Sequence, residues 1–305
     1  MSRLLDDPRH LQILCLGGLL AFGILSLGFD VSLSRVALLL AGVLIAQFGL
    51  GRAAGLPGYD PRSALVSGLS LCLLLRTPSP AVALLAATLT IGSKFVLRVG
   101  GKHFVNPTNF GIVATVWATG AAWVSPGQWG APAVLGFLVV VSGAVVAHRA
   151  LRSDVTAAFL AAYAGLLLLR ALWLGDPLAI PLHQLGSGAL LLFAFFMISD
   201  PRSTPDSRLG RVVFGVAVAA LAVFLQFVRY RPVAVLPALF LLSPLVPLID
   251  RLWPGARYAW PGGSNVHVSP KGVDHASLPV SGSAAPGALA LVRPGVLRLL
   301  RRQGG

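Results

Sequence analysis

The sequence contains little charge and no long polar stretch before residue 250. Only 11% of its 305 residues are Asp, Glu, Lys or Arg, whereas 56% are hydrophobic. A soluble domain of this size carries about 25% charged residues. The composition therefore argues against a soluble enzyme over the first 250 residues. The function must lie among membrane helices or in their short connections.

Cysteine is also scarce, and several common motifs are absent. Cys15 and Cys72 lie in apolar runs without metal-ligand spacing, so we interpret them as small core residues. The sequence has no phosphate-binding loop, no nucleic-acid-binding motif and no chain of intramembrane Asp, Glu or His of the kind that proton pumps use. His103 has no partner at metal-ligand spacing, so no metal site is predicted.

The chain does contain a series of ten apolar stretches. A helix needs about 20 apolar residues to cross ~30 Å of hydrocarbon, although shorter spans occur. The expected spans are 11–29, 35–51, 63–75, 79–97, 107–122, 131–148, 155–174, 184–199, 210–228 and 232–249. The third and eighth are short. The first is expected to be a retained helix, because no small-residue cleavage signal follows it.

Lys and Arg lie almost entirely on alternate connections between these stretches. With the N-terminus inside, 14 basic residues fall on the inner side and 5 on the outer side, the distal tail being left out. The inner set is Arg3, Arg9, Arg52, Arg62, Lys94, Arg98, Lys102, Arg149, Arg152, Arg202, Arg208, Arg211, Arg251 and Arg257, and the outer set is Arg35, Arg76, Arg170, Arg229 and Arg231. Ten spans with both termini in the cytoplasm satisfy the positive-inside rule. Topology and contact with anionic lipid explain the net charge of +14 better than a nucleic-acid partner does.

The third and eighth spans share a pattern that predicts an internal repeat. Each begins with Ser-Gly, at Ser67 and Ser187, and each is followed by a Pro-rich turn. Because five spans separate the two copies, they must cross the membrane in opposite directions. We expect an all-α integral membrane protein with two inverted five-helix repeats, about 11–122 and 131–249, and a disordered basic cytoplasmic tail at 251–305. The alternative is that Leu-, Ala- and Gly-rich helices look alike without being related.

A cationic cluster marks the first candidate binding site. Its members, at the inner end of the fourth span, are Lys94, Arg98, Lys102 and His103. Asn106 is a good helix N-cap and Pro107 suits the first helical position, so the next helix begins at this cluster. Its free N–H groups favour a phosphate or carboxylate, and Asn109 is a candidate polar contact inside the bundle. The alternative is a basic loop that only sets topology and binds lipid headgroups.

A second polar stretch follows the eighth span, also on the inner side. Asp200 ends a short helix, where the negative end of the helix dipole disfavours a carboxylate unless a cation compensates. The candidates for that role are Arg202, Arg208 and Arg211. One interpretation is a salt-bridged turn. The other is that this loop and the 94–109 segment together enclose one anionic ligand.

Two ordered motifs in these stretches resemble a known family, the NqrB and RnfD membrane proteins of sodium-pumping NADH:quinone oxidoreductase and of Rnf electron-transport complexes. One motif runs from Ser93 through Lys102-His103 to Asn106-Pro107-Thr108-Asn109-Phe110-Gly111, and the other runs from Phe196 to Pro205 and continues with Gly210-Arg211 and Phe214-Gly215. Residues 123–130 also fit the family. The resemblance covers about residues 10–250. It implies the ten-helix inverted-repeat fold and a role in flavin-linked electron transfer and ion movement, with redox partner proteins.

The sequence departs from this family at one position. The family's members carry FMN on the threonine of a Ser/Thr-Gly-Ala-Thr motif, and the nearest match here is Ser142-Gly143-Ala144-Val145. Valine has no hydroxyl and cannot form the phosphoester. The resemblance therefore implies FMN or riboflavin held without a covalent bond. The chain looks most like the compact, stand-alone relatives of the UnbU type, which occur in bacterial enediyne biosynthesis gene sets.

Three functions follow from these patterns. The first is a multi-pass protein of the cell membrane that supports electron transfer and holds a flavin or similar anionic cofactor at the cationic cluster. The second is a transporter or channel for a small solute or ion, without a redox cofactor, since inverted repeats with short central helices commonly enclose a midplane pathway. The third is a scaffold for partner proteins.

The topology can be tested directly. Because Gly100 and Thr204 lie in connections that the charge pattern places in the cytoplasm, reporter fusions at both positions should report the inner side. Alkaline phosphatase and a cytoplasmic reporter would be compared at each position. Reporters that place the two turns on opposite faces of the membrane would contradict the predicted threading.

Overall fold

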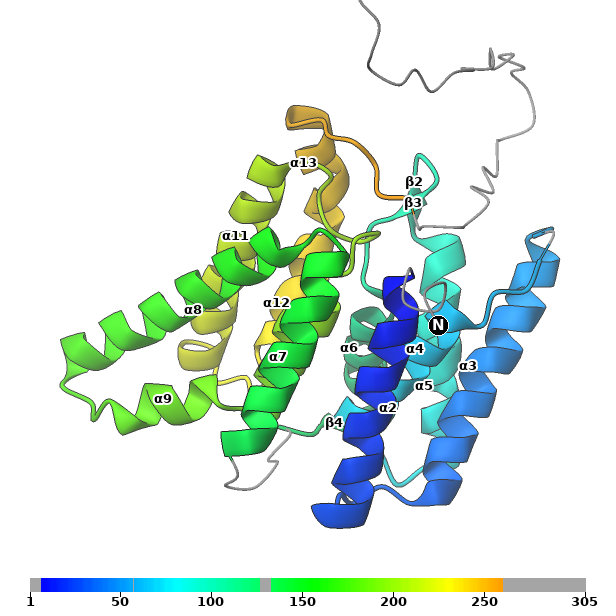
Figure 1. The fold of residues 1–305 in the computed structure, drawn as a ribbon, viewed down its shortest axis with the longest axis horizontal. Helices are drawn as coiled ribbons and strands as arrows, with labels where there is room; N and C mark the ends of the chain where they lie inside the picture. Colours follow the sequence, from blue (N-terminus) through cyan, green and yellow to red (C-terminus); the bar gives the residue numbers. More distant parts are fainter. Residues whose placement is uncertain (1–6, 57, 127–132, 260–305) are drawn as a thin grey trace, which may run out of the picture. The chain divides into compact units, whose positions relative to one another are not determined.

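The computed structural model describes residues 7–56, 58–126 and 133–259, and these are mostly α-helical (Figure 1). The helices of the first half are α2 (Pro8–Ser26), α3 (Leu33–Ala53), α4 (Arg62–Leu74), α5 (Pro80–Val96) and α6 (Pro107–Thr119). Those of the second half are α7 (Ala133–Arg149), α8 (Ser153–Leu174), α9 (Ala179–Leu185), α10 (Gly188–Leu192) with the π-helical turn η1 (Phe193–Met197), α11 (Arg208–Phe227), α12 (Val235–Leu242), the 3-10 turn η2 (Ser243–Leu245) and α13 (Val246–Leu252). The predicted tail from residue 260 on, and residues 127–130 of the third family-like stretch, lie outside the described residues.

Among the residues that the structure describes, five helical segments are long and apolar enough to cross a membrane. They are α2, α3, α8, α11 and the continuous run Val235–Leu252, and a sixth arises if α9 and α10–η1 are counted as one span bent by 48°. The chain is therefore a multi-pass helical membrane protein. The predicted eighth span, 184–199, is wrong at its start, because residues 179–185 form the separate helix α9 before the bend. The tenth helical segment continues to Leu252, beyond the predicted end at residue 249.

Four two-residue strands occur between the helices in the described part of the chain. Strand β1 (Leu75–Arg76) pairs antiparallel with β4 (Trp123–Val124), and β2 (Arg98–Val99) pairs antiparallel with β3 (Lys102–His103). The second pair is a hairpin whose turn residues, Gly100 and Gly101, both have positive φ. Glycine adopts this conformation without a steric penalty, which explains the Gly-Gly pair at this turn.

Side-chain caps begin many of the helices. The caps are Asp7, Ser32, Ser79, Asn106, Ser187 and Ser207, each of which accepts a hydrogen bond from a backbone N–H of the first turn. Proline occupies the first helical position after three of them, at Pro8, Pro80 and Pro107. The predicted start of α6 at Asn106–Pro107 is thereby confirmed.

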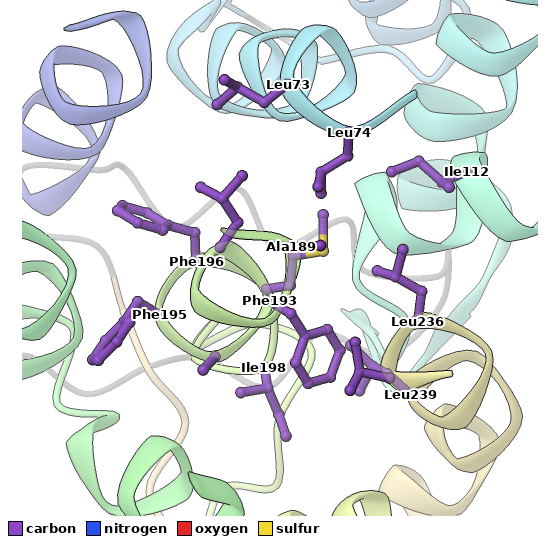
Figure 2. Close-up of a cluster of buried hydrophobic side chains, with 14 of the residues drawn as sticks. Leu73, Leu74, Ile112, Ala189, Phe193, Phe195, Phe196, Ile198, Leu236 and Leu239 are labelled. Atoms are coloured by element: carbon purple, nitrogen blue, oxygen red, sulfur yellow. The ribbon is translucent and has the colours of Figure 1, made fainter. Parts of the chain in front are cut away.

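The two short helices of the halves meet in the core. Helix α4 has 13 residues, so it is about 20 Å long and shorter than the hydrocarbon layer. Figure 2 shows Leu73 and Leu74 of α4 and Ile112 of α6 facing Ala189 and Phe193 of α10–η1, with Leu236 and Leu239 of α12 beside them. All of these side chains are buried. A buried apolar layer therefore joins α4 and α6 to α10–η1 and α12.

Glycine allows two helix pairs to pack closely. A Cβ at Gly111 of α6 would overlap the Thr90 hydroxyl of α5 and lie 3.0 Å from the Ala86 carbonyl oxygen. A Cβ at Gly215 of α11 would lie 3.0 Å from the Val155 carbonyl oxygen of α8. These glycines belong to the two family-like motifs, so each motif contains a residue that sets a helix-helix distance.

Gly111→Ala should destabilise the protein. The added methyl group cannot fit against Thr90 without separating α5 from α6, and overpacking of this kind costs about 1–3 kcal/mol. Gly92→Ala in α5 is the matched control, because nothing lies within 4 Å of its Cβ position. There the loss of a helical glycine should stabilise the protein by about 0.5–1 kcal/mol. Thermal unfolding in detergent measures both, and equal melting temperatures for the two variants would contradict this packing.

Candidate functional site

The two polar stretches predicted from the sequence meet at one end of the helix bundle. The Asn106 side chain caps α6 by accepting a hydrogen bond from the Asn109 N–H (2.9 Å). Its Nδ2 donates to the Met197 carbonyl oxygen (3.2 Å) and lies 3.5 Å from Oδ2 of Asp200. The start of α6 in the first half is therefore bonded to the end of η1 in the second half.

Lys102 is the strongest link between these stretches. Its Nζ donates to Oδ1 of Asp206 (2.8 Å), Oδ2 of Asp250 (2.8 Å) and the carbonyl oxygen of Thr204 (2.7 Å). The Asp206 N–H donates to the other oxygen of Asp250 (2.7 Å). An ammonium group has three donors, and all three are used here. Lys102, which the sequence suggested as a cofactor contact, thus joins β3, the 198–207 loop and α13.

Asp200 lies beside His103 at the end of η1. Oδ2 of Asp200 is 3.9 Å from Nε2 of His103 and accepts a hydrogen bond from the Ser203 hydroxyl (2.9 Å), while Oδ1 accepts one from the Arg202 N–H (3.1 Å). Burial alone would raise the pKa of Asp200, but His103 and these donors together hold it below its ordinary value. Burial lowers the pKa of His103, and the neighbouring Asp200 partly offsets that effect. Hydrogen-bond donors thus offset the unfavourable position of the Asp200 carboxylate at the negative end of the helix dipole.

The three predicted arginines of this loop have different surroundings. Arg211 pairs with Asp154 of α8 (2.6 Å), and Arg208 is exposed. Arg202 gives its backbone N–H to Asp200, but its guanidinium makes no hydrogen bond or ion pair with any residue that the structure describes. Its charge lies near Arg98 and His103 and lowers the pKa of both, after the larger effect of burial.

Arg98 and Lys94 complete the cationic side of the site. Nε of Arg98 is buried and has no hydrogen-bond partner within the described ranges. Nζ of Lys94 donates to the hydroxyl (3.0 Å) and the carbonyl oxygen (3.2 Å) of Ser63, near the start of α4. The arrangement therefore offers unused cationic N–H groups next to the start of α6, where an anion is favoured. Oδ1 of Asn109 is also buried and unpartnered in the described part of the chain.

A three-residue pattern that sequence reasoning missed explains part of this geometry. Asp-Pro-Arg occurs at residues 7–9, 60–62 and 200–202. In each copy the arginine N–H donates to Oδ1 of its aspartate, at 3.0, 3.1 and 3.1 Å, so all three are the same side-chain turn. A search for repeated tripeptides at the inner helix ends would have found it.

The first two copies form a closed ion-pair cluster. Arg9 pairs with Asp7 (2.6 Å) and Asp60 (2.8 Å), and Arg62 pairs with Asp60 (2.8 Å) and Asp7 (2.8 Å). Burial raises the pKa of Asp60, but the hydrogen bonds from Arg62 and the charge of Arg9 outweigh it and lower the pKa to about 2. The third copy differs, because its arginine side chain does not pair with its own aspartate and lies near Arg98.

Another missed residue, Arg152, holds the second polar loop in place. Its Nε donates to the Thr204 hydroxyl (3.0 Å) and its Nη2 donates to the Pro201 carbonyl oxygen (3.2 Å). Its guanidinium lies 5.5 Å from the centre of the Tyr258 ring. Arg152 is only 4% exposed, so it acts as an internal brace of the loop that carries Asp200 and Arg202.

Comparison with known proteins gives a consistent result. Residues 125–258 match the NQR2, RnfD, RnfE family. The chain is similar to three proteins that are each named as the D component of an ion-translocating oxidoreductase complex. The protein from Stutzerimonas stutzeri is 44% identical over 71 residues, which are 23% of this chain and 20% of that protein. The protein from Aeromonas salmonicida (strain A449) is 33% identical over 133 residues, which are 44% of this chain and 35% of that protein. The protein from Citrobacter koseri is 39% identical over 105 residues, which are 34% of this chain and 29% of that protein. These matches span from a fifth to about a third of the relatives' length.

Lys102→Met should destabilise the protein strongly. It leaves Asp206 and Asp250 partly buried without their cation, and such a loss costs about 3–5 kcal/mol. Adding Asp206→Asn and Asp250→Asn to the same chain removes the unpaired charges and should recover part of the loss. Arg208→Gln, at an exposed cation, should change stability by about 0.5 kcal/mol or less. Melting temperatures in detergent decide the matter, and a Lys102→Met protein as stable as the parent would show that the pairing is not structural.

Proposed function

Because this chain is a multi-pass inner-membrane protein related to the NQR2, RnfD, RnfE family, we propose that it acts as an RnfD-type membrane component. In this role it supports flavin-linked electron transfer, coupled ion transport or both, together with redox partner proteins. The named relatives belong to ion-translocating oxidoreductase complexes, which supports the role. An association with enediyne biosynthesis stays a prediction from the sequence.

The proposed fold has ten spans in two inverted halves, with both termini in the cytoplasm. Three helix pairs of the first half have counterparts in the second half. The pairs α3–α5, α5–α6 and α2–α4 correspond to α8–α11, α11–α12 and α7 with α10–η1, in that order. Corresponding helices also meet across the halves, since α2 packs on α7 and α6 packs on α12. These pairings are what a pseudo-two-fold axis in the membrane plane would produce.

The proposed site is an anion-binding site for a flavin between the two halves. The observation that carries it is the third Asp-Pro-Arg turn, in which the Arg202 guanidinium is released from Asp200 and lies near the unpartnered Nε of Arg98. Like charges held together next to a helix start are stabilised by an anion between them. We assign the contacts with the anion to Arg98, Arg202, His103 and Lys94, and the shaping of the site to Asn106 and Lys102.

The flavin is proposed to be held without a covalent bond. Val145 occupies the place of the family's threonine, and its side chain is 44% exposed on the surface of α7. When bound, the flavin would supply the electron-transfer chemistry. The residues of this chain would bind its phosphate, orient it at the start of α6 and keep the pKa of Asp200 below its ordinary value.

The experiment is to purify the full chain in detergent and measure flavin by absorbance. Flavin should copurify, or added FMN should bind at micromolar concentration. Arg98→Gln and Arg202→Gln should each weaken FMN binding about tenfold, because each removes a charge-assisted hydrogen bond. Riboflavin, which lacks the phosphate, should be affected much less.

Arg52→Gln, at the inner end of α3, is the control and should leave FMN binding unchanged. If flavin neither copurifies nor binds, the proposal fails and the cofactor-free transporter becomes the better explanation. Equal weakening of FMN and riboflavin in Arg98→Gln would show that these residues do not contact a phosphate.

A further inference from the structure

A polar cavity lies beside the β2–β3 hairpin, on the face that carries Val99 and Lys102. It has a volume of about 290 Å³ and is bounded by the hairpin, α13, Asp206 and the segment 254–257 that follows α13. In an antiparallel pair, directly opposed side chains lie on the same face. Arg98 is opposed to His103, and Val99 is opposed to Lys102. The hairpin therefore turns Arg98 and His103 toward the flavin site proposed above, and Val99 and Lys102 toward this cavity.

The carboxylates that line the cavity are already occupied. Lys102 and the Asp206 N–H engage three of the four carboxylate oxygens of Asp206 and Asp250. Two lining arginines have donors to spare. Nη1 of Arg257 donates a hydrogen bond to the Gly100 carbonyl oxygen (2.6 Å). Neither Arg257 nor Arg251 forms an ion pair among the residues described. The cavity thus carries a surplus of cationic donors, with three lining cations and two lining carboxylates.

The rest of the lining is apolar. Val99, Phe104, Val246 and Pro247 form this wall. Two guanidinium forks beside an apolar wall, at the inner end of a helix long enough to cross the membrane, suit a phosphate group that carries a nonpolar substituent. The volume is at the lower limit of ligand cavities, so it fits a headgroup and not a whole cofactor.

The segment after α13 is built to hold Arg257 at this cavity. Figure 1 shows it turning from the end of α13 back toward the β2–β3 hairpin. A Cβ at Gly255 would lie 2.6 Å from both the Asp206 carbonyl carbon and the Ser207 nitrogen, so only glycine allows the segment to run so close to the loop. This contact fixes the position of Arg257 relative to Arg251.

We propose that this cavity binds a phosphate group through Arg251 and Arg257, either that of an anionic phospholipid headgroup or that of a soluble phosphate ester. The site is separate from the flavin site and does not depend on the proposed function. A protein without flavin would leave it intact.

The test measures binding to the full chain in detergent by native mass spectrometry. The probes are phosphatidylglycerol, diacylglycerol with the same chains but no phosphate, and glycerol 3-phosphate. Phosphatidylglycerol should bind and diacylglycerol should not. Binding of glycerol 3-phosphate as well would identify a soluble ester as sufficient, whereas its failure to bind would identify the lipid as the source of the phosphate.

Variants localise the site. Arg251→Gln and Arg257→Gln should each weaken phosphate binding about tenfold. Gly255→Val, which lifts the segment without removing a charge, should weaken it similarly. Arg52→Gln is the matched control at another inner arginine, and melting temperatures of all variants verify folding. Diacylglycerol binding equal to that of phosphatidylglycerol, or unchanged affinity in the Arg251→Gln/Arg257→Gln double variant, would overturn the proposal.

Discussion

The organisation of the inner face depends on one buried cation. The Lys102 ammonium group stands where the β2–β3 hairpin, the 198–207 loop and α13 converge, and it satisfies acceptors from the last two at once. Removing the ammonium group from water costs free energy, which its three oxygen acceptors offset. They can do so because the hydrogen bond from the Asp206 N–H to Asp250 orients both carboxylates. The two faces of the same hairpin carry different side chains, with Arg98 and His103 on one face and Val99 and Lys102 on the other. A change at Lys102 therefore affects the relation between the halves more than the affinity of any one ligand.

The candidate site contains one of three repeated Asp-Pro-Arg turns, and this turn differs from the other two. Three Asp-Pro-Arg turns share the same hydrogen bond from the arginine N–H to its aspartate. Two of them neutralise each other in a closed cluster at the inner ends of α2 and α4. The third separates its charges: Asp200 faces His103 and Asn106, while the Arg202 side chain lies near Arg98. One local motif thus forms a closed ion-pair cluster in two copies, whereas in the third its arginine side chain has no such partner among the described residues.

Much of the inner face could be anticipated from the sequence, but the roles of its residues could not. Asn106 and Pro107 predicted the start of α6 because capping is a local interaction, and the short third span predicted α4 because hydropathy reports segment length directly. The partners of Lys102 lie 104 and 148 residues away, so no local pattern could identify them. The bend before α10 was missed because hydropathy reports how apolar a segment is and does not report its direction.

The sequence by itself determined that this chain lies in a membrane, where α6 begins, and which connections collect its positive charge. These properties follow from composition and from interactions within a few residues. Only the tertiary structure decided which cations are neutralised and which are left with unused donors, because each pairing is made between helix ends far apart in the chain. Arg202 and Lys102 both looked like ligand contacts in the sequence. The oxygens that surround Lys102, and the lack of such a partner for the Arg202 guanidinium among the described residues, separate a structural cation from a candidate binding one.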